Sequence, residues 1–219
     1  MVENRLLNSK NVLLKKLLQD KIVSLNEIIK PGFNFGLVTR NDNPKEYFVG
    51  LVLNKIYSLV ISMENSVFAN DVFISIYLYR YVYELCIKVF YIFSNSSEDQ
   101  VLFRLNEFFE NKKWTFSVIN SRIDTNLLPP KFAENHKKTY EQICRFVHPN
   151  IDSLRLHLNR TDDQQFEFIV PNINLTIWYI VAIIKLFLNL KILNLDANID
   201  QKRIESLQSL EISLNDLNN

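Results

Sequence analysis

Only three glycines, Gly32, Gly36 and Gly50, occur in the 219 residues of this chain. Loops that bind phosphate groups need several glycines at fixed spacing, so that the backbone can approach the phosphate. Neither a Walker-type loop nor a dinucleotide-binding fingerprint can be written with these three positions. A β-rich fold also needs glycine for its tight turns. The chain is therefore expected to be mainly α-helical, without a phosphate-binding loop of either kind.

The composition is that of a globular protein, with 47% hydrophobic and 22% charged residues. This length allows one domain with a sizeable core. Lys and Arg (25) nearly balance Asp and Glu (24), so no overall field attracts nucleic acid or an anionic membrane. Cys86 and Cys144 lie in apolar stretches and are interpreted as reduced, buried thiols. Because residues 1–10 lack the apolar region of a signal peptide, a cytoplasmic location is expected.

Apolar residues recur at three- and four-residue steps along most of the chain. The predicted helices cover about 3–30, 44–66, 67–93, 98–112, 130–148, 173–195 and 197–219. The first is one helix or two, broken near Ser24, and either Ser96 or Ser97 is the N-cap of the fourth. The predicted organisation is an N-terminal helical arm (1–30), a loop (31–45) and a main helical domain (46–219), within one globular unit.

One segment departs from the helical pattern. Apolar and polar residues alternate on both sides of a polar turn at 159–163, which predicts a small β-hairpin near 153–171. The predicted fold is an all-α bundle with this hairpin inserted.

The most hydrophobic segment, 173–195, is long enough to span a bilayer. Asn174, Lys185 and Asn189 lie inside it, and a lysine at mid-membrane costs about 3 kcal/mol on insertion scales. Lys185 and Asn189 share one face, so the remaining faces can be buried in protein. A buried core helix is the favoured interpretation, and membrane association is the weaker alternative.

Three charges interrupt the apolar helix predicted at 67–93. Arg80, Glu84 and Lys88 are spaced four residues apart, so they project from one face. A structural interpretation is an Arg80–Glu84 pair that fixes the register of neighbouring helices. A functional interpretation is a polar pocket or a dimer interface. Both interpretations stay open at this stage.

A second candidate cluster lies at 140–150, where Tyr140, Cys144 and His148 share one helical face. His148 would act as a general acid/base or a phosphate-binding group, or else would only cap the helix before Pro149. Basic residues around this helix leave RNA as a candidate ligand. Cys144 and His148 lack further ligands at suitable spacing, so neither a metal nor a cofactor is expected.

Two motifs carry a resemblance to known families. Leu-Tyr-Arg-Tyr-Val-Tyr-Glu-Leu (78–85) and Ile-Cys-Arg-Phe-Val-His-Pro-Asn (143–150) resemble a family of prokaryotic helical domains of unknown function. The layout is also similar to the HEPN superfamily, which includes metal-independent ribonucleases of defence systems. Those enzymes carry Arg-x4–6-His at a helix end, whereas only two residues separate Arg145 from His148 here. The chain departs from the catalytic pattern at this point.

The resemblance implies a helical binding or interaction module of a prokaryotic stress or defence system, of the toxin–antitoxin or abortive-infection type. Its pocket or dimer interface would involve Arg80, Glu84 and His148, with Lys88, Tyr140 and Asn150 as further ligand-binding candidates. The partner would be a second copy or a cognate protein. The alternative is a HEPN-like ribonuclease, with His148 as general acid/base and Arg145 or Arg80 stabilising charge on the phosphate.

Overall fold

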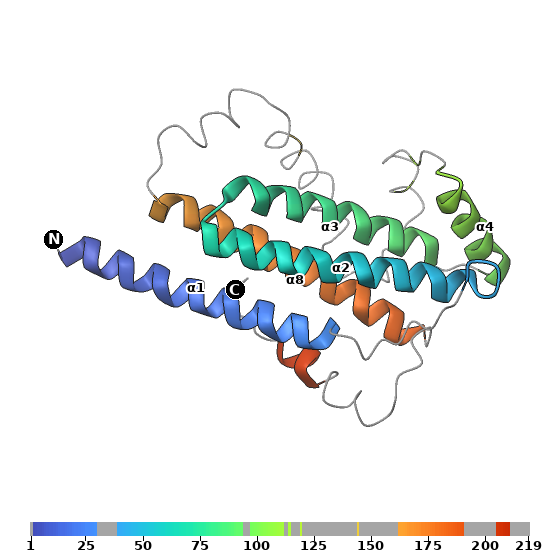
Figure 1. Cartoon of the computed structure of the whole chain (residues 1–219), viewed down its shortest axis with the longest axis horizontal. Helices are drawn as coiled ribbons and strands as arrows, with labels where there is room; N and C mark the ends of the chain where they lie inside the picture. Colours follow the sequence, from blue (N-terminus) through green and yellow to red (C-terminus); the bar gives the residue numbers. More distant parts are fainter. Residues whose placement is uncertain are drawn as a thin grey trace.

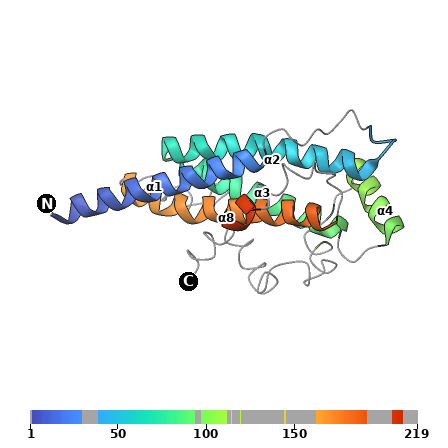
Figure 2. The same cartoon turned by 90° about the horizontal axis from the view of Figure 1, so that it is seen from below.

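The computed structural model of this chain describes residues 2–29, 39–93, 97–111, 114, 119, 144, 162–190 and 205–210. Four long helices, α1 (Val2–Ile29), α2 (Pro44–Ala69), α3 (Val72–Phe93) and α8 (Asp162–Asn189), form a bundle, and α4 (Glu98–Phe109) lies across one end (Figures 1 and 2). The described part of the chain contains no strand, so the predicted all-α class is confirmed.

Helices α3 and α8 run in the same direction and α2 runs opposite to both (Figure 1). Helix α1 packs against α2 and α8, and its first turns extend past the end of the bundle in both views. Its buried residues, Leu18, Ile22, Leu25 and Ile29, follow the three- and four-residue steps of one helical face. The apolar face of α1 therefore packs against the bundle.

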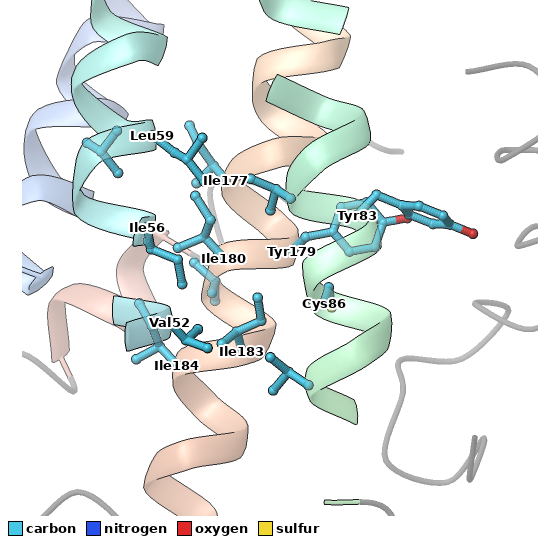
Figure 3. Close-up of a cluster of buried hydrophobic side chains, with 14 of the residues drawn as sticks. Val52, Ile56, Leu59, Tyr83, Cys86, Ile177, Tyr179, Ile180, Ile183 and Ile184 are labelled. Carbon is cyan, nitrogen blue, oxygen red and sulfur yellow. The ribbon is translucent and has the colours of Figure 1, made fainter. Parts of the chain in front are cut away.

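The core is mainly aliphatic between α2 and α8. Figure 3 shows side chains of both helices meeting there, and all of those named are at most 8% exposed: Val52, Ile56, Leu59, Ile177, Ile180, Ile183 and Ile184. Tyr83 and Cys86 on α3 lie beside this cluster with Tyr179 of α8. Burying these apolar side chains is the main force that holds the bundle together.

Polar side chains connect α8 to two of its neighbours. The Lys21 ammonium on α1 donates to Asn174 Oδ1 at 3.2 Å, and Asn172 Nδ2 donates to Ser75 Oγ on α3 at 3.4 Å. Each bond forms fully in only one register of its two helices. Since a slip of one helix along another would break these bonds, they favour one alignment of α1 and α3 on α8.

The helix predicted at 67–93 begins later, at Val72, because a turn separates α2 from α3. Asn70 adopts the left-handed conformation (φ 54°) and its backbone N–H donates to Ser66 O, which ends α2. The Asp71 carboxylate then accepts from the backbone N–H of Ile74 at 2.9 Å and caps α3. The start at residue 67 was wrong because asparagine replaces the glycine that usually marks such a turn.

The Asp71 cap gives a first testable prediction. Asp71→Ala removes the acceptor for the Ile74 N–H, so the free energy of unfolding should fall by about 1 kcal/mol. Urea denaturation followed by circular dichroism measures the change. Asp71→Asn, which keeps an acceptor, should lose clearly less. Equal losses in both variants would show that the cap bond contributes nothing.

The hairpin predicted near 153–171 is not seen. Its second half, with Phe166, Phe168 and Val170, belongs to α8, and its first half lies outside the described residues. Phe166, Ile169 and Ile173 are all buried at helical spacing, so they place one helical face on the core. Pro171 is tolerated inside this helix because it lies on the exposed side, where water can bond the carbonyl that its missing N–H leaves free.

The remaining predicted helix boundaries can be compared with those in the structure. Helix α1 continues through Ser24, whose hydroxyl donates to Asp20 O at 2.9 Å, so the first predicted segment is one helix and not two. Ser97 is the N-cap of α4, and its backbone N–H donates to Gln100 Oε1 at 3.3 Å, as in a capping box. Near the C-terminus, residues 205–210 are helical, and Leu207 and Leu210 are buried.

Two described helices, Pro44–Ala69 and Phe166–Asn189, are long and apolar enough to cross a membrane by length and composition alone. About half of the most apolar stretch of each helix, 50% and 56%, is buried inside the protein. The exposed positions of α2 include Asn54, Lys55 and Glu64, which a lipid-facing surface would disfavour. Apolar side chains, among them Leu51, Ile61 and Phe68, are exposed on α2 as well, so its surface is mixed.

Candidate functional site

Helix α3 is apolar on nearly every side, yet one of its faces is uncovered. Its buried side packs on α8, where the Tyr79 and Tyr179 rings stack with centroids 5.9 Å apart. The opposite side leaves Ile74, Tyr77 and Tyr81 exposed by 41%, 54% and 45%. These three side chains are spaced three and four residues apart, so they form a continuous apolar strip along the helix.

The charged residues Arg80 and Glu84, which the sequence singles out, lie next to this strip on the same helix. Arg80 Nε lies 2.9 Å from Glu84 Oε1, and the two side chains are 25% and 35% exposed. The sequence-based expectation that these residues pair is therefore confirmed. A half-exposed pair of this kind contributes only about 0.3–0.5 kcal/mol to helix stability. The pair is therefore a minor factor in folding.

Lys88 and Lys55 add positive charge at the same surface. Lys88 is half-buried and lies one turn beyond Glu84 on the same helix face. Lys55 Nζ, from α2, lies 4.9 Å from the centroid of the Tyr81 ring. This cation–π contact holds a cation of one helix beside an aromatic ring of the other. The surface therefore combines aromatic rings with charges of both signs.

We call the five residues Ile74, Tyr77, Tyr81, Glu84 and Lys88 the α3 seam. They are separated by three, four, three and four residues, which is the spacing of core positions in a coiled coil. Sequence reasoning identified Glu84 and Lys88 but did not single out the tyrosines. The signal for Tyr77 and Tyr81 was their position on the same face as the charges.

The other half of the predicted site lies outside the described residues. His148, Arg145, Tyr140 and Asn150 belong to that part, so the predicted pocket of Arg80, Glu84 and His148 stays a prediction. Cys144 is helical and half-buried. Among the described residues, no group of three metal-ligating side chains occurs.

Burial makes two groups on the other side of α3 unreactive. Burial raises the pKa of the Cys86 thiol, which keeps it protonated and agrees with the predicted inert thiol. Burial also raises the pKa of Tyr179, and neighbouring Tyr79 adds to the shift. These neutral groups serve as packing between α3 and α8, so acid–base chemistry is not expected there.

A concave site, which sequence reasoning missed, lies between α1 and the helical residues 205–210. This groove has a volume of about 530 Å³ and is lined by Leu17, Asp20, Lys21, Ser24, Glu205, Ser206, Ser209 and Leu210. Lys21 is only 9% exposed, and burial lowers the pKa of its ammonium. Its bond to Asn174 joins residues 153 positions apart, so no local pattern could reveal the site.

The comparisons with known proteins give no relative for this chain: no protein-family model, curated protein sequence or solved structure matches it.

Proposed function

We propose that this protein is a helical interaction module that binds a protein partner through the α3 seam. The uncovered strip of Ile74, Tyr77 and Tyr81 carries the proposal. Tyrosines on the surface of a soluble protein commonly anchor protein interfaces, because a rigid ring buries a large area and its hydroxyl still bonds. The neighbouring Arg80–Glu84 pair supplies a polar rim beside that apolar strip.

The setting of this module belongs to the same proposal. The 78–85 and 143–150 motifs resemble prokaryotic helical domains of unknown function, and the similarity of the layout to the HEPN superfamily suggests a toxin–antitoxin or abortive-infection system. The ribonuclease alternative depends on His148 with Arg145 or Arg80, and His148 and Arg145 lie outside the described residues. Interface function is supported by residues whose exposure and pairing are known, so it is the function that we put forward.

Site-specific photo-crosslinking tests the proposal. A photoreactive phenylalanine analogue replaces Tyr77, and the matched control places it at Phe103, which is 61% exposed on α4. We expect one discrete protein adduct in host cells from position 77 and none of that mass from position 103. Tyr81→Glu should abolish the adduct, because a carboxylate at this position disrupts the apolar strip.

Three outcomes would contradict this function. The first is the same set of adducts from both positions, and the second is no adduct from position 77. The third is an adduct that nuclease removes, which would make RNA the ligand. If the purified chain also cleaves RNA, and His148→Ala abolishes cleavage without changing the melting temperature, the ribonuclease alternative replaces the interaction module.

A further inference from the structure

Four of the five residues of the α3 seam have a spacing that is symmetric when the helix is reversed. Tyr77, Tyr81, Glu84 and Lys88 are separated by four, three and four residues, which reads the same in both directions. A second α3 that lies antiparallel across this face can therefore present the same four positions in register. Such self-complementarity is what a two-fold interface between identical chains requires.

From this symmetry we infer that the partner of the seam is a second copy of this chain, docked with its α3 antiparallel to the first. The inference rests on the proposed function. In this register Tyr77 lies opposite Lys88 of the second copy, and Tyr81 lies opposite Glu84 of the second copy. Each of these two facing pairs occurs twice in the dimer, because the two-fold axis passes midway between Tyr81 and Glu84.

Both facing pairs can form favourable contacts. The Tyr81 hydroxyl can donate to the Glu84 carboxylate of the second copy, and the Lys88 ammonium of that copy can lie over the Tyr77 ring. A parallel arrangement would instead place Glu84 opposite Glu84 and Lys88 opposite Lys88. Like charges at facing positions repel, so the sequence of the seam selects the antiparallel arrangement.

Residues beside the seam support the same register. Lys55 already lies 4.9 Å from the Tyr81 ring, so it is near the position that Glu84 of the second copy would occupy. Arg80 holds Glu84 at 2.9 Å within its own chain, which limits the freedom of that carboxylate before docking. The seam is thus ordered in the single chain, and this reduces the entropy lost on association.

Sedimentation equilibrium of the full chain tests the inference. The wild-type chain should be a dimer at micromolar concentrations. Tyr81→Glu places a carboxylate opposite Glu84 of the second copy, and we expect the dissociation constant of the dimer to rise at least about 30-fold. Tyr81→Glu combined with Glu84→Lys restores opposite charges across the axis and should recover most of the affinity. Phe103→Glu, on α4, is the matched control and should leave the dimer unchanged.

Circular dichroism confirms that each variant keeps its helix content, which is expected because residue 81 is 45% exposed. A wild-type chain that stays monomeric at all concentrations overturns the inference, as does a double variant that is no better than Tyr81→Glu alone. If the chain is monomeric while position 77 still crosslinks to another protein, the proposed interaction module stands. Only the inference that its partner is a second copy is then wrong. If position 77 crosslinks to nothing, both proposals fail.

Discussion

Replacing Phe187 with alanine should lower the free energy of unfolding by about 3–5 kcal/mol. Phe187 is fully buried on α8, and its ring meets Phe93 of α3 edge to face, with centroids 5.9 Å apart. Alanine leaves a cavity between the two helices that share the largest interface of the bundle. Because the neighbouring side chains relax only in part, the lost contacts are not recovered. Urea denaturation followed by circular dichroism measures the change.

The matched control for this variant is Phe103→Ala. It removes the same atoms from a helix, but Phe103 is 61% exposed, so the free energy of unfolding should change by no more than about 0.5 kcal/mol. Similar losses at both positions would contradict the account of the core. They would mean that the α3–α8 interface is not where the stability of this fold resides.

The second large effect concerns Lys21. Lys21→Met leaves Asn174 Oδ1 without its donor, so the free energy of unfolding should fall by about 1–3 kcal/mol at neutral pH. Asn174→Leu should also destabilise, because it removes an acceptor from a buried ammonium. The double variant replaces both partners with apolar side chains and should recover much of the loss. A double-mutant cycle measures this coupling, and additive losses would contradict it.

Lys21 should also affect the pH dependence of stability. Burial lowers its pKa in the folded chain, while the unfolded chain keeps a value near 10.5. Between these two pKa values the unfolded state binds more protons, so this group makes stability increase as pH rises through that window. Lys21→Met should flatten the rise between the lowered pKa and about pH 10.5. An unchanged slope would mean that Lys21 does not titrate differently on folding.

The fold could be predicted from sequence where helical periodicity was long and uninterrupted. The helices that begin at Pro44 and Glu98 were predicted within a residue or two of their observed starts, since Pro44 and Ser97 carry recognisable start signals. The wrong predictions lie where a local sequence signal and packing against the core favour different helix boundaries. Asn70 ended a helix without a glycine, and Pro171 did not end one, because its side of α8 faces solvent.

The candidate site was predictable only in part. The Arg80–Glu84 pair follows from the four-residue spacing alone. The exposure of Tyr77 and Tyr81 does not, because a single sequence does not say which side of an apolar helix its neighbours cover. The Lys21 groove needed tertiary structure for a similar reason, since α1 and residues 205–210 come together only in the folded chain.

Tyrosine footprinting with hydroxyl radicals in intact host cells tests most directly whether the α3 seam is an interface. Tyr57 provides an internal reference: it is 37% exposed, and it lies on α2 two positions from Lys55, so it points away from the seam. We predict that Tyr77 and Tyr81 react more slowly in cells than in dilute purified protein, while Tyr57 reacts equally in both. If all three tyrosines react in cells as they do in the dilute chain, the seam is an ordinary solvated helix face and the proposed interface does not exist.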